Sequence, residues 1–253
     1  MSVSEVLGDD RERAIRDAVA KLDVAALGAR FAEERVLVLD VLPRSLVDEM
    51  VREARKLAKG ARRTRVPFVR KGGAVGHGRI RERAPALYAL QRSPSLLAFF
   101  QRIAGPELEH RRPDDPHASA IYVYSARGDH VGWHFDDCGC EPQASFTVIM
   151  GLVDESSSRL EVAPFYKIEA RRDEQRAIAT APGSLVFFCG SDVYHRVTPL
   201  RRGEERISFS FVYVKQGHHP RGVAAWRQTA INAFLYFGVG QTLLSSVRAL
   251  DRR

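Results

Sequence analysis

A series of short, β-branched and aromatic segments in the second half of the chain restricts its fold most strongly. Gly, Asp and Pro residues, which favour turns, separate these segments. Strands are expected over residues 121–124, 131–136, 144–153, 160–164, 184–189 and 206–214. Short strands at this spacing predict an antiparallel barrel or a two-sheet roll.

The first half of the chain is expected to be mainly helical. Apolar residues at helical spacing predict helix over 5–34, a short strand over 35–40, and a second helix from Pro43 to about Ala58. Two short helices begin at Pro85 and Ser93 and end near Gly105, and the tail from Ala224 is again predicted to be helical. Because helices precede strands, we expect the helices to pack outside one sheet, in an α+β fold with a mainly β core.

The length of 253 residues fits one sizeable domain, and 45% hydrophobic residues suffice for a core. We expect a single domain over 1–253, with a helical part at 1–117, a β-barrel core at 118–215 and C-terminal helices at 216–253.

Neither a membrane span nor a signal peptide is expected. The most apolar late run, 231–244, is shorter than the roughly 20 residues that a membrane helix needs. Residues 1–10 contain neither a basic start nor an apolar run. Three cysteines are too few for a disulfide scaffold and favour a reducing, cytoplasmic location. The spacing of Cys138 and Cys140 is not that of a redox pair or zinc knuckle, and their role stays open.

The net charge of +8 is concentrated in one segment. Residues 52–83 contain twelve Lys or Arg and two Glu, so the rest of the chain carries a net charge of −2. Within this segment, the glycine-rich stretch 61–78 is expected to form a long loop. Arg79 and Arg81 follow it and are candidates to clamp a substrate carboxylate beneath a mobile lid; the alternative is a solvated basic face. Nucleic-acid binding is not favoured, since Phe68 is the one aromatic residue in the glycine-rich stretch.

Candidate metal ligands lie in the strand region. Side chains two apart on a strand share a face, so His134 and Asp136 are expected to point together into the barrel. His195 begins a later strand, after the turn signal at 189–191. Two imidazoles and one carboxylate are the ligand set of non-haem Fe(II) oxygenases, which leaves three octahedral positions for cosubstrate and O2. Zinc is the alternative metal.

Arg206 is a candidate to bind an oxo-acid cosubstrate. A guanidinium offers a planar fork of donors that binds a carboxylate at two points. Ser208 lies two residues on and shares the face of Arg206. An Arg inside a barrel is costly without an anionic partner, and a dicarboxylate would supply one. The alternative is an outward-facing salt bridge to Glu204 or Glu205.

Gly132–Asp136, His195 and Arg206–Ser208 together resemble the iron(II)/2-oxoglutarate-dependent oxygenase superfamily. Within it, softer patterns resemble the radical halogenases of free amino acids and their hydroxylase relatives. These patterns are at 146–152, 158–160, 182–190 and 236–238.

The resemblance implies a double-stranded β-helix, a jelly-roll or cupin-like barrel. It implies Fe(II) bound by the triad, 2-oxoglutarate held by Arg206 with Ser208, and consumption of O2 with release of succinate and CO2. The halogenases carry a small residue, and bind halide, where this chain has Asp136. The resemblance therefore implies hydroxylation of an unactivated C–H bond, with desaturation or ring formation not excluded.

Several further residues are candidates to bind substrate or cosubstrate. In the resembling group an acid three residues after the first metal His contacts the substrate amine, and Asp137 matches it; the alternative is a turn residue. By alternation His130 shares the face of His134 and is a candidate for a substrate carboxylate, or it lies in a turn. The group's own histidine is one position later, where this chain has Val131.

Aromatic residues near the predicted site have two interpretations each. Trp133 either stacks beneath the site or fills the core. Tyr122 and Tyr124 share one strand face and either line the cosubstrate wall or serve packing.

The leading hypothesis is a hydroxylase of a free amino acid or a similar small polar metabolite. The second is an oxygenase that acts on a protein or nucleic acid, attracted by the basic segment. The third is a non-catalytic cupin-like module with a structural metal, against which the open coordination positions and Arg206 argue.

Overall fold

The computed structural model describes residues 9–67, 69–136 and 144–218. Its helices are α2 (Asp9–Val19), α3 (Val24–Glu34), α4 (Arg44–Ala58), α5 (His77–Arg83), α6 (Pro85–Arg92) and α7 (Pro94–Ala104), with a 3-10 turn η1 (Glu169–Arg171). Its strands are β1 (Val36–Asp40), β2 (Arg62–Val66), β3 (Arg70–Gly76), β4 (Leu108–His110), β5 (Ser119–Tyr124), β6 (His130–His134), β7 (Ser145–Glu155), β8 (Leu160–Ala163), β9 (Arg176–Ile178), β10 (Ser184–Cys189), β11 (Tyr194–Val197) and β12 (Glu205–Lys215).

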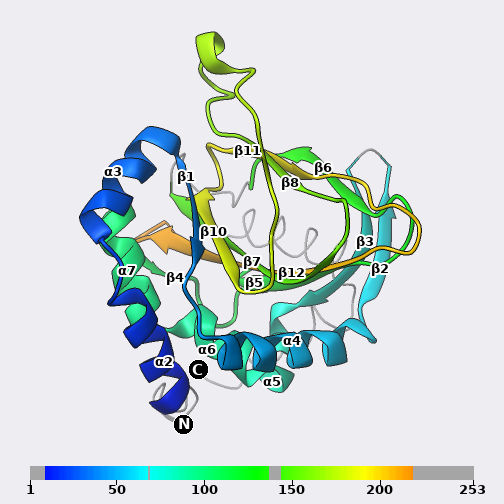
Figure 1. Cartoon of the computed structure of the whole chain (residues 1–253), viewed down its shortest axis with the longest axis horizontal. Helices are drawn as coiled ribbons and strands as arrows, with labels where there is room; N and C mark the ends of the chain where they lie inside the picture. Colours follow the sequence, from blue (N-terminus) through cyan, green and yellow to red (C-terminus); the bar gives the residue numbers. More distant parts are fainter. Residues whose placement is uncertain (1–8, 68, 137–143, 219–253) are drawn as a thin grey trace.

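One twelve-stranded antiparallel sheet forms the centre of the molecule. Its strand order is β1-β10-β7-β12-β5-β3-β6-β11-β8-β9, with β2 added to β3 and β4 added to β12. Figure 1 shows this sheet curving round into a barrel, while the N-terminal helices lie along its outer side. The predicted β-barrel core with external helices is therefore confirmed.

The two faces of the sheet serve different cores. On β10, Leu185 and Phe187 pack into the large apolar core that the helices share with the outer face. Val186 and Phe188 point the opposite way, into a smaller inner cluster. Because both faces of β10 are buried, its sequence is continuously apolar instead of alternating.

The N-terminal helical prediction over 5–34 is confirmed from residue 9 onward, as two helices; residues 5–8 lie outside the described residues. The chain breaks between α2 and α3, where the Asp23 carboxylate caps α3 by accepting from the backbone N–H of Ala26 at 3.0 Å. The predicted strand 35–40 and the helices beginning near Pro43, Pro85 and Ser93 are also found.

The prediction that 61–78 is a loop was wrong. This stretch forms the β2–β3 hairpin, and β3 lies between β5 and β6 in the sheet. Its glycines allow close approach: a Cβ on Gly72 would lie 3.2 Å from the carbonyl oxygen of Val123, and Gly72 has φ +153°. Glycines that resembled loop formers therefore let a strand pack tightly against β5.

Two short strands, β4 and β9, were not predicted. The helices expected at 216–253 and the single-domain boundary lie largely outside the described residues and stay predictions. Among the described residues, no helix combines the length and hydrophobicity that a bilayer span requires.

His77, the first residue of α5, is hydrogen-bonded to Ser119, the first residue of β5. His77 is 1% exposed; its Nδ1 accepts from the Ser119 hydroxyl at 2.8 Å, and its Nε2 donates to the carbonyl oxygen of Pro113 at 3.2 Å. Burial lowers the pKa of His77 to about 4 and the pKa of His110 to about 3. Both side chains are therefore neutral in the folded protein at pH 6, where an unfolded chain partly protonates them.

We predict that the free energy of unfolding falls as the pH decreases from 6.5 to about 4, because the unfolded state then binds more protons. Each pKa unit contributes about 1.4 kcal/mol. Denaturant unfolding across this range should give a smaller pH slope for His77→Asn than for the wild type. The same replacement of the half-buried His117 serves as the control. Equal slopes for wild type and His77→Asn would contradict the assignment.

Candidate metal centre and cosubstrate site

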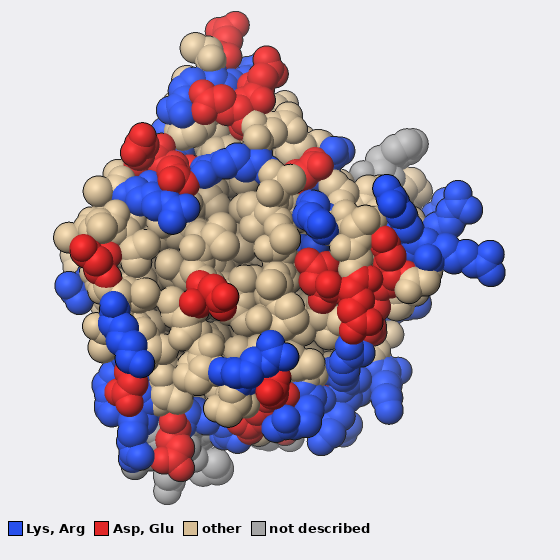
Figure 2. Space-filling model, viewed as in Figure 1, with Lys and Arg blue, Asp and Glu red and all other residues tan. Residues whose placement is uncertain are grey.

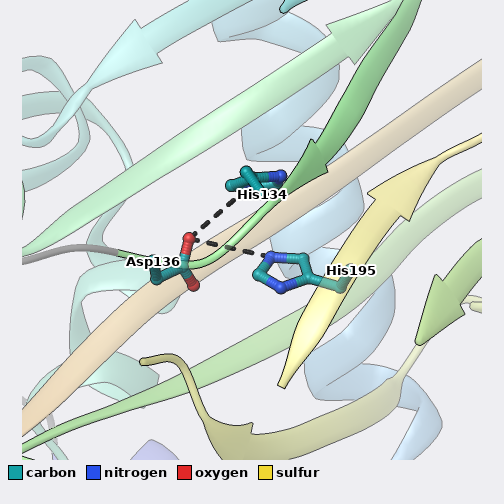
Figure 3. Close-up of side chains that lie close together, drawn as sticks. All are labelled: His134, Asp136 and His195. Carbon is teal, nitrogen blue, oxygen red and sulfur yellow. Dashed lines mark ion pairs between the residues drawn. The ribbon is translucent and has the colours of Figure 1, made fainter. Parts of the chain in front are cut away.

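His134, Asp136 and His195 converge on one point inside the barrel. The Nε2 atoms of His134 and His195 lie 3.5 Å and 3.7 Å from Oδ1 of Asp136, and one ligand atom from each residue lies within 4.8 Å of the others. Figure 3 shows the three side chains pointing toward one another from β6, the segment after it, and β11. The sequence prediction of this cluster is thus matched by the geometry.

Strand pairing brings the two histidines together. His195 on β11 is directly opposite His134 on β6, and their ring centroids are 4.2 Å apart. The Nδ1 of each ring is bonded to the backbone carbonyl two residues before it: Gly132 at 2.9 Å for His134 and Val193 at 3.0 Å for His195. Because carbonyls accept, each Nδ1 carries the proton and each Nε2 is left free to bind a metal.

The charges of the three groups suit a cation. Burial opposes ionisation of Asp136, but the two histidines and the hydroxyl of Thr147 outweigh it and lower the pKa of the carboxyl. Burial and the neighbouring His134 lower the pKa of His195 to about 4. Burial opposes protonation of His134 too, yet Asp136 raises its pKa. A carboxylate beside imidazole nitrogens is a donor set that fits Fe(II), and also zinc.

Arg206 on β12 is 1% exposed and points inward. Its Nη1 donates to the carbonyl oxygen of Ser158 at 3.1 Å and lies 3.8 Å from the carboxylate of Asp154. Its Nε has no hydrogen-bond partner among the described residues. A buried guanidinium with an orphaned donor fits a further anionic group, such as the carboxylate of an oxo acid.

The alternative outward-facing salt bridge of Arg206 is not found. Glu205 instead pairs with Arg55 at 2.8 Å, and Glu204 accepts from the backbone N–H groups of Ser157 and Arg201.

The predicted cosubstrate wall lies on the same face as Arg206. Tyr124 is opposite Arg206 and Tyr122 is opposite Ser208 in the β5–β12 pairing. Tyr124 and Ser208 are buried, and Tyr124 belongs to the inner apolar cluster. The structure thus brings these four residues together, and Tyr124 also has the packing role considered as its alternative.

A β-bulge changes the predicted position of His130. The pairs His195–His134 and Val197–Val131 show that three residue steps on β6 face two on β11. Val131, not His130, therefore shares the face of His134. The face predicted for His130 by simple alternation was wrong, and its role in binding a substrate carboxylate stays a prediction. His130 lines a cavity of about 280 Å³ together with Arg65, Arg70 and Lys71 of the β2–β3 hairpin.

The other predicted substrate contacts that the structure describes have partners of their own. Trp133 stacks on Tyr194 with ring centroids 5.1 Å apart, beneath Arg196. On α5, Arg79 donates to the carbonyl oxygen of Gly60 at 2.9 Å and Arg81 donates to that of Pro113 at 3.0 Å. Asp137, Cys138 and Cys140 lie outside the described residues.

Sequence reasoning missed two buried residues near the site. Arg70 is 1% exposed, and its guanidinium carbon is 5.4 Å from the centroid of the Tyr122 ring. The sequence does not indicate that Arg70 is buried, because the glycines that follow it are typical of a loop. Thr147 donates from Oγ1 to Oδ2 of Asp136 at 2.6 Å. Alternation along 144–153 would have placed Thr147 on one face with Ile149, but it gives no sign of the partner.

Two protein families match the sequence. The family described as halogenase D matches residues 19–150, just over half of the chain. The 2OG-Fe(II) oxygenase superfamily matches residues 119–214, which contain the whole His-Asp-His cluster and Arg206. No curated protein matches the sequence.

Solved structures share the fold at low sequence identity. The α-ketoglutarate-dependent epimerase SnoN from nogalamycin biosynthesis has a TM-score of 0.65 at 17% identity, over 79% of this chain and 85% of SnoN. A Pseudomonas putida prolyl-4-hydroxylase has a TM-score of 0.58 at 18% identity, over 79% and 100%. A Trichoplax adhaerens prolyl hydroxylase, in complex with a hypoxia inducible factor peptide fragment, has a TM-score of 0.59 at 14% identity, over 85% and 94%.

The family matches, the shared fold and the convergent side chains agree with one another. SnoN has also been crystallised with Fe3+ and α-ketoglutarate. The chain belongs to the halogenase D family and to the 2OG-Fe(II) oxygenase superfamily, and it is an enzyme that depends on iron and 2-oxoglutarate.

Proposed function

We propose that this enzyme hydroxylates an unactivated C–H bond of a free amino acid or a similar small polar metabolite, with O2 as oxidant and release of succinate and CO2. The observation that carries the proposal is the position of Asp136 Oδ1, 3.5 Å and 3.7 Å from the two imidazole Nε2 atoms. A carboxylate there completes a two-histidine, one-carboxylate set.

In this proposal His134, Asp136 and His195 hold Fe(II), and Arg206 with Ser208 holds the far carboxylate of 2-oxoglutarate. Tyr122 and Tyr124 line the cosubstrate side. Iron with 2-oxoglutarate and O2 supplies the oxidant that attacks the C–H bond. The protein's part is to orient both partners and to exclude water from the site.

The presence of Asp136 also favours oxygen transfer over halogen transfer. The resembling halogenases have a small residue at this position, and halide takes the vacant coordination site. Here the carboxylate is present, and a hydrogen bond from Thr147 at 2.6 Å anchors it. The proposal is therefore hydroxylation, although the matching family is described as a halogenase.

The inner wall supports a small anionic substrate. The buried guanidinium of Arg70 lies over the ring of Tyr122. Arg70 on β3 pairs with Val131 on β6, so the two side chains share one face of the sheet. A guanidinium there is a group that a substrate carboxylate could bind. Asp137 stays a predicted contact for the substrate amine. The roles of His130, Trp133, Arg79 and Arg81 stay predictions on which the proposal does not depend.

The contacts of the basic segment 52–83 do not favour a nucleic-acid substrate. Arg55 pairs with Glu155 and Glu205, and Arg63 pairs with the buried Asp129. Figure 2 shows acidic and basic side chains interspersed on the face in view. A peptide substrate stays the second candidate, since one structural neighbour is a prolyl hydroxylase in complex with a peptide. A cytoplasmic location is proposed from the cysteine content alone.

Arg206→Gln should weaken 2-oxoglutarate binding at least about 10-fold, because a hydrogen bond to a charged group contributes about 1.5–3 kcal/mol. Anaerobic titration of the Fe(II) enzyme with 2-oxoglutarate, followed by its charge-transfer absorbance, measures the Kd. Arg201→Gln is the control, since the Arg201 side chain is exposed. Thermal unfolding tests whether each variant is folded. An unchanged Kd in a folded Arg206→Gln variant would exclude Arg206 as the carboxylate partner.

A screen of the twenty amino acids should find at least one that stimulates succinate release. The product should contain one added oxygen atom, and no halogen, even in excess chloride. Mass spectrometry identifies the product, and His134→Ala should abolish both signals. If no amino acid stimulates succinate release, free amino acids are ruled out as the substrate class. The anaerobic charge-transfer absorbance would still test the oxygenase site separately. A chlorinated product would overturn the hydroxylation proposal.

A further inference from the structure

The carboxylate of Asp136 is held so that its two oxygens have different surroundings. Oδ1 lies 3.5 Å and 3.7 Å from the Nε2 atoms of His134 and His195. Oδ2 accepts the hydroxyl proton of Thr147 at 2.6 Å. That distance is typical of a strong hydrogen bond from a hydroxyl to a carboxylate. One oxygen therefore faces the candidate metal position, and the other is occupied by the protein.

Thr147 is well placed to hold this orientation. It is 1% exposed on β7, where it pairs with Phe188 of β10 and Val212 of β12. Neighbouring strands on both sides leave the backbone of Thr147 little freedom to move. A β-branched side chain has few rotamers, so the hydroxyl direction is restricted as well.

Gly190 provides the space for this contact. A Cβ on Gly190 would lie 2.7 Å from Oγ1 of Thr147 and 2.8 Å from Cβ of Asp136, which is closer than real Cβ atoms approach. The carbonyl oxygen of Gly190 also accepts the backbone N–H of Asp136 at 2.9 Å. Gly190 thus positions the backbone of Asp136 and leaves room for Thr147 to reach its carboxylate.

We propose that Thr147 is a positioning residue that restricts Asp136 to binding the metal through a single oxygen. A carboxylate without this hydrogen bond is free to turn and bind the metal with both oxygens, which would fill a coordination position that the cosubstrate or O2 requires. The inference rests on the proposed metal site. It adds that Thr147 and Gly190, neither of them a metal ligand, determine how many coordination positions of the metal Asp136 occupies.

The test uses Co(II) as a spectroscopic probe in the 253-residue protein, without cosubstrate. The intensity of the visible Co(II) bands reports the coordination number, and an anaerobic titration gives the Co(II) affinity. Thr147→Val removes the hydroxyl and keeps the shape of the side chain. Thr147→Ser retains the hydroxyl. Thr180→Val is the matched control, because Thr180 is equally buried and its hydroxyl has no hydrogen-bond partner among the described residues.

Thr147→Val should change the Co(II) spectrum and weaken Co(II) binding about 10-fold, a typical loss when a partner of a metal ligand is removed. Thr147→Ser should recover the wild-type spectrum, and Thr180→Val should keep it. If Thr147→Val does not fold, Gly190→Ala should give the same spectral change, because the added methyl group forces Thr147 and Asp136 apart.

Two results would overturn the inference, and they differ from each other. A Thr147→Val protein with the wild-type spectrum and affinity would show that Thr147 does not restrict Asp136, while the metal site itself stands. A wild-type protein that binds Co(II) no better than His134→Ala would remove the metal site, and with it both this inference and the proposed function.

Discussion

The pairing of β11 with β6 is the contact on which the chemistry depends. It sets His195 directly opposite His134, and the bulge beside this pair allows Val131 to share their face. Asp136 follows two residues later, where its backbone N–H is bonded to Gly190. Backbone hydrogen bonds between segments far apart in the sequence thus bring the three candidate ligands to one point.

The two faces of the sheet have different roles: the outer face packs into the main core, and the inner face carries the candidate site. The outer face joins the helices in a large apolar core. The inner face carries an apolar cluster together with the half-buried Asp136 and the buried Arg206 and Arg70, and buried charges are costly. Each of these charged groups is oriented by a neighbour: Thr147 for Asp136, Ser158 for Arg206 and Tyr122 for Arg70. A carboxylate suits binding of a cation, and a guanidinium suits binding of an oxo acid.

The sequence predicted the features that follow from local pattern. The apolar run of β10, the His-Asp spacing and the inward direction of Arg206 all come from residue type and strand alternation. Features that depend on distant partners were missed. The glycines of β3 are typical of a loop in the sequence, and only the pairing with β5 explains them as strand residues. The bulge in β6 likewise depends on its pairing with β11 and not on the residues of β6 alone. The roles of Arg70 and Thr147 likewise depend on neighbours that no local pattern reveals.

The most direct test of the account is a crystal structure of the protein grown without oxygen in the presence of Fe(II) and 2-oxoglutarate. We expect one iron bound by Nε2 of His134, Nε2 of His195 and a single oxygen of Asp136. We also expect the far carboxylate of 2-oxoglutarate against the guanidinium of Arg206. Iron bound elsewhere, or a cosubstrate that does not touch Arg206, would contradict the account.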